Sequence, residues 1–82
     1  MNVRERADLW KKQILDLTES VGLARPLTVP DGRKIVVVLP EKEHVIISND
    51  REVYIEECFL IDKTAPVWRI FLLDDVRELK VS

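Results

Sequence analysis

Apolar residues recur at helical spacing along the first quarter of the chain. Intervals of three or four residues place them on one face of an amphipathic helix: Val3, Ala7, Trp10, Ile14, Leu17 and Val21. Asn2 is a favourable N-cap with Glu5 three residues later, and Gly22 can end a helix in a left-handed conformation. This pattern predicts a helix over residues 3–21.

The pattern changes to short β-like segments after Pro26. Asp31 and Gly32 form a turn signal, and the run from Ile35 to Leu39 is apolar on both faces, as in a central strand. Further strands are predicted over residues 44–48, 51–62, 67–73 and 79–81. The longest of these segments interrupts its apolar alternation at Glu57, which predicts a β-bulge there.

The connections between these segments are too short for parallel crossovers, so we expect the strands to run antiparallel. The sequence thus predicts a single α+β domain over residues 1–82, with an N-terminal helix and a meander of four to six strands over about residues 27–82. Asp74 and Asp75 predict a 3₁₀ turn before the last strand. We expect a strongly bent sheet or a small SH3-like or Sm-like barrel, with the helix at its open end or on one face.

The closing stretch carries a distinctive order of residues at five positions: Arg69, Phe71, Leu73, Asp74 and Val76. In this order it resembles the end of WYL domains, in which isoleucine usually stands at the last of these positions. The resemblance implies a small barrel, and in that family the barrel is a regulatory, ligand-binding module. Asp75 stands where the family usually has arginine, and the Trp-Tyr-Leu tripeptide is absent, so the family's ligand is not carried over.

Composition and charge narrow the function. The net charge is −2, and residues 26–62 hold eight acidic against four basic residues, whereas nucleic-acid binding draws much of its free energy from basic side chains. Cys58 is the only cysteine, which favours a reducing, cytoplasmic setting. The first ten residues are charged where a signal peptide needs an apolar core, and no apolar run is long enough to span a membrane.

Catalytic and metal-binding patterns are sparse. His44 is the only histidine, and a Cys58–His44 nucleophile–base pair competes with a buried Cys58 and an exposed His44 that have no chemical role. One cysteine and one histidine do not make a structural zinc site, and the acidic residues lack EF-hand spacing. We therefore predict a protein that is not an enzyme and has no catalytic residue, cofactor or metal ligand.

The remaining interpretation is a protein-interaction or regulatory module. Its candidate surface residues lie off the helix stripe or near the closing strand: Leu9, Leu15, Tyr54, Trp68 and Arg69. The expected partner is a second copy of the chain or another protein, and the acidic middle segment would favour a basic partner.

Two alternatives stay open for the residues near the closing strand. A small barrel that binds a ligand or nucleic acid would use Tyr54, Trp68 and Arg69 together with Arg33 and Lys34 for stacking and charge. In a purely structural arrangement, Trp68 packs beneath the helix and the stem of Arg69 lies over Phe71 or Tyr54.

Overall fold

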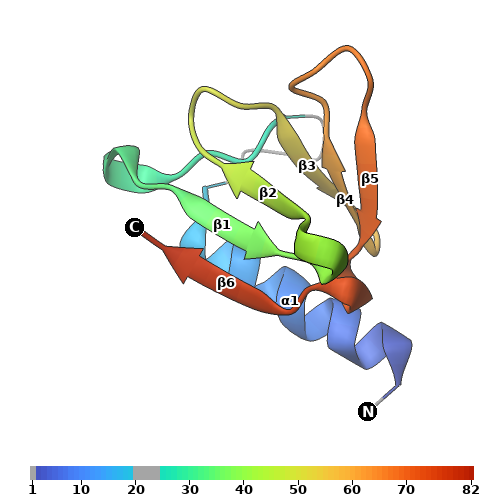
Figure 1. Ribbon diagram of the computed structural model, residues 1–82. Coiled ribbons are helices and arrows are strands. Elements are labelled where there is room, and N and C mark those ends of the chain that lie inside the picture. Colours follow the sequence, from blue (N-terminus) through green and yellow to red (C-terminus); the bar gives the residue numbers. More distant parts are fainter. Residues whose placement is uncertain (1, 20–24) are drawn as a thin grey trace.

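The computed structural model describes residues 2–19 and 25–82. Within those residues one α-helix precedes six strands, so the α+β prediction is confirmed (Figure 1). The elements in chain order are α1 (Val3–Leu17), η1 (Pro30–Gly32), β1 (Ile35–Val38), η2 (Pro40–Lys42), β2 (His44–Ile47), β3 (Val53–Glu56), β4 (Phe59–Asp62), β5 (Arg69–Leu72), η3 (Leu73–Asp75) and β6 (Glu78–Val81).

Helix α1 begins at the predicted cap. The side-chain oxygen of Asn2 accepts a hydrogen bond of 2.9 Å from the backbone N–H of Glu5, which satisfies one donor of the first turn. The middle of the predicted stripe packs on the core and its ends do not: Ala7 and Ile14 are buried, Trp10 is half-buried, and Val3 and Leu17 are exposed. The helix therefore covers the core through its central turns.

The helix ends earlier than predicted, at Leu17. Thr18 takes an extended conformation, and its hydroxyl donates a hydrogen bond of 2.9 Å to the carbonyl oxygen of Ile14. A threonine side chain that bonds to the preceding turn competes with helix continuation. The predicted helix end at Val21 and Gly22 lies outside the described residues.

The first sheet has the strand order β2–β1–β6, with both pairings antiparallel. The side chains of Ile35 and Val37 are fully buried and the alternate residues of β1 are half-buried, as predicted for a central strand. The pairing of β1 with β6 continues to Lys34 and Ser82, whose backbones exchange hydrogen bonds of 3.4 and 3.0 Å. The last strand thus returns to the first one instead of extending the meander beside β5.

The second sheet has the order β3–β4–β5, and it corrects the prediction of one long strand over residues 51–62. That segment is a hairpin in which Glu56 lies opposite Phe59 and the chain reverses through Glu57 and Cys58. Glu57 has a φ of 53°, a left-handed conformation of the kind that two-residue hairpin turns require. The charge that interrupts the apolar alternation therefore marks a turn and not a bulge.

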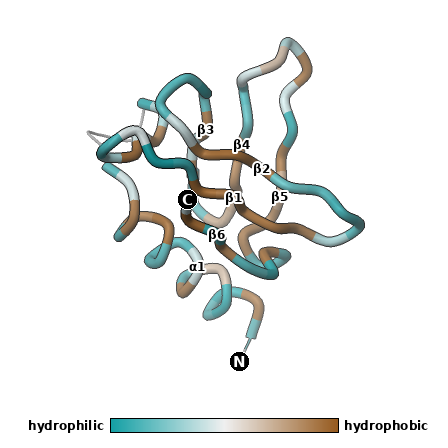
Figure 2. Tube along the Cα trace, turned by 60° about the vertical axis from the view of Figure 1, so that its left-hand side comes forward, coloured by the Kyte–Doolittle hydropathy of each residue, from teal (hydrophilic) through white to brown (hydrophobic). Residues whose placement is uncertain are grey.

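The two sheets enclose one core and do not close into a barrel, since no strand pairing joins one sheet to the other in residues 2–19 and 25–82. The largest fully buried side chains come from the helix, from both sheets and from η3: Ile14, Ile35, Ile47, Leu60 and Leu73. Helix α1 lies beside β6 and contacts η3 (Figures 1 and 2).

The predicted turns form where expected. Asp31 and Gly32 have φ angles of 60° and 66° in the turn before β1, and Leu73–Asp75 forms the predicted 3₁₀ turn before β6. The connection between β1 and β2 also takes left-handed angles, 60° at Glu41 and 63° at Lys42. Both residues carry a Cβ, so this hairpin bears a conformational cost that glycine would avoid.

Candidate interaction surface

The second sheet turns one face to the core and one face to solvent. Two cross-strand rows make up the face turned away from the core: Tyr54–Ile61–Ile70 and Glu56–Phe59–Leu72. Ile61, in the middle of the first row, is itself buried at 8% exposed. Residues directly opposite each other in antiparallel strands share a face, and so do residues two apart along one strand. These six residues and Trp68, two positions before Ile70, are called the outer face below.

The outer face exposes large apolar side chains. Their exposed fractions are 57% for Trp68, 58% for Ile70, 41% for Leu72 and 38% for Phe59. Scattered exposed apolar residues are ordinary, whereas a contiguous group of them marks a site of contact with another molecule. This face is therefore the strongest candidate surface in the part of the chain that the structure describes.

Lys63 lies against two aromatic rings at one end of the outer face. Its ammonium nitrogen is 4.4 Å from the ring centroid of Tyr54 and 4.5 Å from that of Trp68. Cation–π attraction of this kind contributes about 0.5–1 kcal/mol at exposed sites. Tyr54 and Trp68 thus lie close together, and the alternative in which Trp68 packs beneath the helix is wrong because Trp68 is 57% exposed.

Arg69 lies on the opposite, inner face of β5. One guanidinium nitrogen donates to Asp62 at 2.7 Å, and the other donates to the backbone carbonyl of His44 at 3.2 Å and to Glu43 at 3.4 Å. The guanidinium carbon is 5.7 Å from the ring centroid of Phe71, in line with the structural alternative for its stem. Arg69 therefore links the second sheet to β2 and does not belong to the outer face with Trp68.

Asp62 is the buried partner of this network. Its carboxylate also pairs with Arg51 at 3.4 Å and accepts a hydrogen bond of 3.0 Å from the backbone N–H of Thr64. Burial alone would raise the pKa of Asp62, but the hydrogen bonds from Arg69 and Thr64 outweigh it and lower the pKa to about 2. Asp62 is thus ionised at neutral pH, and its role is structural.

The two helix candidates form separate spots. Leu9 and Leu15 are both exposed, as predicted. They lie six residues apart, which at 3.6 residues per turn separates their directions by about 120° around the helix axis. Leu9 lies nearly opposite the buried Ala7 and Ile14, and Leu15 lies to one side of them, so the two side chains do not combine into one surface.

Four residues of the surface or its border were not predicted from the sequence: Phe59, Ile70, Leu72 and Lys63. Treating residues 51–62 as one strand grouped Phe59 with Val53 on a core face. The two-residue turn reverses this assignment, because Phe59 then shares a face with Tyr54 and the fully buried Leu60 shares one with Val53. The adjacent charges of Glu56 and Glu57 were the sequence signal that could have indicated this turn.

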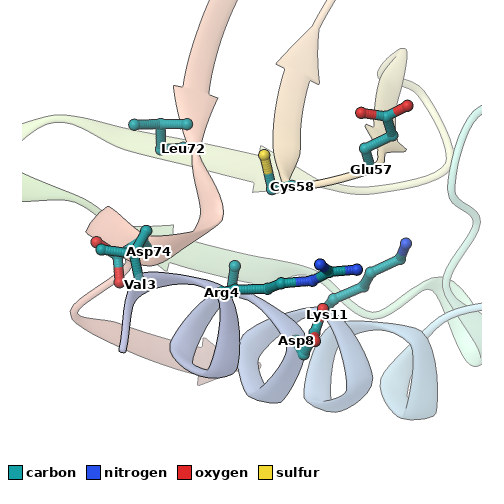
Figure 3. A pocket seen from close by; sticks show the side chains of 9 residues that line it. Val3, Arg4, Asp8, Lys11, Glu57, Cys58, Leu72 and Asp74 are labelled. Carbon is teal, nitrogen blue, oxygen red and sulfur yellow. The ribbon is translucent and has the colours of Figure 1, made fainter. Parts of the chain in front are cut away.

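A groove of about 720 Å³ lies between α1 and the β3–β4 turn (Figure 3). The helix contributes Arg4, Asp8 and Lys11 to it, and the opposite wall contributes Glu57, Cys58 and Leu72. Both signs of charge are present on its walls, so the groove does not select for an anion or a cation. It adjoins the outer face at Leu72, which belongs to both.

The remaining candidate chemistry is not assembled into a site. Cys58 is half-buried at the hairpin turn, His44 is exposed at the start of β2, and no hydrogen bond is found between their side chains in the described residues. Over residues 2–19 and 25–82, no group of three or more histidine, cysteine, aspartate or glutamate side chains is placed to hold a metal ion. Arg33 and Lys34 were grouped with Trp68 in the nucleic-acid alternative. They lie between η1 and β1 of the first sheet, whereas Trp68 precedes β5 of the second sheet. In Figure 1 the segment before β1 is well separated from the β4–β5 loop.

Comparison with known proteins leaves the family open. No protein-family model matches the chain, and no curated protein or solved structure matches it. The resemblance of residues 69–76 to WYL domains therefore remains a prediction. In the part of the chain that the structure describes, no helix has both the length and the apolar character needed to cross a membrane.

Proposed function

We propose that this chain is a non-enzymatic protein-docking domain whose contact surface is the outer face of the second sheet. The observation that supports this is the joint exposure of Phe59, Trp68, Ile70 and Leu72 on one continuous face. Removing apolar surface from water contributes about 25 cal/mol per Å², and buried tryptophan and tyrosine side chains are frequent centres of binding energy. Tyr54 and Trp68 would be such centres here.

The aromatic end of the face supports a second candidate. Lys63 between the rings of Tyr54 and Trp68 combines a cation with two stacking surfaces, as in sites for single-stranded nucleic acid. The basic residues that this function would need beyond Lys63 are at a distance, since Arg69 is bound to Asp62 on the inner face. Protein docking is therefore the proposal, and nucleic-acid binding is an outcome of its test.

The proposal includes a cytoplasmic setting. Its support is the single free thiol of Cys58, because a reducing compartment keeps cysteines unpaired. The acidic balance of residues 26–62 favours a basic protein surface as the wider docking target.

A matched pair of variants tests the surface. Phe59→Lys places a charge on the outer face, and Leu9→Lys places the same charge on the helix at a similar exposure. Each immobilised variant is compared with the wild-type chain by affinity capture from cell extract, followed by mass spectrometry. We expect at least one protein that is captured by the wild-type chain and by the Leu9→Lys variant. The Phe59→Lys variant should not capture it.

Two results would contradict the proposal. The first is loss of the captured protein by Leu9→Lys with retention by Phe59→Lys, which would move the docking surface to the helix. The second is tight, salt-sensitive binding of a single-stranded oligonucleotide that Lys63→Ala removes, which would favour the nucleic-acid function.

A further inference from the structure

Strand β5 is an edge of the second sheet, and the hydrogen-bond pattern shows which of its backbone groups face outward. The N–H of Leu73 donates to the carbonyl oxygen of Cys58 at 2.8 Å, in the same register as the β4–β5 pairing. Antiparallel pairs alternate between hydrogen-bonded and non-hydrogen-bonded types. The backbone groups of Arg69 and Phe71 therefore also face β4.

The alternate residues turn their backbone groups away from the sheet. These are Trp68, Ile70 and Leu72, and no backbone hydrogen bond to any of the three is found among the described residues outside the β4–β5 ladder. The same three residues carry exposed apolar side chains on the outer face. An apolar edge with unsatisfied N–H and C=O groups is a template for another strand.

The other edges are partly blocked. The carbonyl oxygen of Val53 on β3 accepts a hydrogen bond of 2.8 Å from the N–H of Leu27, and the carbonyl oxygen of His44 on β2 accepts one from a β5 arginine. The edge strand β6 carries exposed charges at Glu78 and Lys80, a common protection against pairing. Strand β5 has one charged residue, Arg69, whose guanidinium is held by Asp62 on the inner face, and its three outward-facing residues are apolar.

We propose that β5 of a second copy of this chain pairs antiparallel with this edge, about a twofold axis at Ile70. The second copy would occupy the strand edge beside the outer face and leave that face open, so the proposal goes beyond the docking function above. The flanks restrict the register, because Pro66 has no N–H to donate and the 3₁₀ turn begins at Leu73. Ile70 then lies opposite Ile70 of the second copy.

This register is self-complementary. Trp68 lies opposite the second copy's Leu72 on the outer face, and each opposed outward-facing pair can exchange two backbone hydrogen bonds. On the inner face Arg69 lies opposite the second copy's Phe71, so like charges do not meet directly. The outer faces of the two copies join into one continuous apolar surface, and a twofold interface of this type repeats each contact.

A charge swap at the axis tests the pairing. Ile70→Lys and Ile70→Glu each place like charges opposite one another across the twofold axis, and Ile70 is exposed enough to carry them in the monomer. By sedimentation velocity we expect each variant to raise the dimer Kd at least about tenfold over wild type. An equimolar mixture of the two variants should restore a dimer, because lysine then meets glutamate. Val67→Lys, an exposed position outside the paired segment, should change the Kd by no more than about twofold.

Other outcomes would overturn the pairing. A wild-type chain that stays monomeric up to about 1 mM would exclude it, and so would a dimer that Ile70→Lys leaves intact. Failure of the mixture to restore the dimer would show that Ile70 does not meet itself. If the pairing fails while Phe59→Lys still loses a partner that Leu9→Lys keeps, the docking function of the outer face stands without the dimer.

Discussion

The two sheets have the same size and opposite edge chemistry. In the first sheet, each solvent-side row ends in a charged residue on β6: Ile46–Val36–Lys80 and His44–Val38–Glu78. In the second sheet, both rows end in an exposed apolar residue on β5, at Ile70 and Leu72. Because charge on an edge strand opposes pairing, β6 is protected against a further strand, whereas β5 presents an apolar edge.

The core sides of the sheets differ as well. The first sheet contributes apolar side chains alone, such as the fully buried Ile35, Val37 and Val45. The second sheet adds the ionised Asp62, which Arg69 joins to the edge of the first sheet through His44. The first sheet is therefore held by apolar packing, whereas the second is also oriented by a polar network.

The largest expected effect tests which face of β4 packs on the core. Leu60→Ala should lower the free energy of unfolding by about 3 kcal/mol, because Leu60 is fully buried and its loss leaves a cavity. Phe59→Ala should cost about 1 kcal/mol or less, because that ring is on the outer face. Urea denaturation measures both values. A larger loss for Phe59→Ala would mean that residues 51–62 form one strand after all.

A smaller effect should come from acid. The pKa of Asp62 in the folded chain is about 2, below its ordinary value of 3.8, so its ionised form stabilises the fold. That contribution, about 2 kcal/mol, is fully present above about pH 4 and is lost as the pH falls through about 2. Thermal or urea unfolding from pH 7 to pH 2 measures it. The Asp62→Asn variant should be less stable than the wild-type chain at pH 7 and should lose less stability on acidification. If the stability of both chains falls equally with pH, Asp62 does not have the stabilising role given to it.

The smallest effect concerns the hairpin turns, one in each sheet. Lys42 and Glu57 have φ angles of 63° and 53°, which cost residues with a Cβ about 1–2 kcal/mol. Lys42→Gly and Glu57→Gly should each raise the free energy of unfolding by about 1 kcal/mol. Glu43→Gly is the control, because its φ of −75° gives glycine no advantage and the change should destabilise the chain. If all three glycine variants are less stable than the wild-type chain, Lys42 and Glu57 do not have the left-handed conformation described here.

Local sequence signals predicted the elements better than their pairing. The cap at Asn2, the turn at Asp31 and the central strand at Ile35 follow from short-range chemistry, and the structure confirms them. The pairing of β6 with β1 depends on distant segments, which a strand pattern does not specify. The outer face was missed for a related reason, since one two-residue turn at Glu57 decides on which side Phe59 lies.

The return of the last strand to the first also has a consequence for folding kinetics. The bonds between Lys34 and Ser82 close a loop of 48 residues, whereas the β3–β4–β5 hairpins form between near neighbours. Long-range contacts slow folding because the entropy of loop closure is lost before they form. During folding, the second sheet with its apolar edge would thus form before β6 joins the first sheet. In that interval the chain is most exposed to aggregation, so chaperone contact should concentrate on β5.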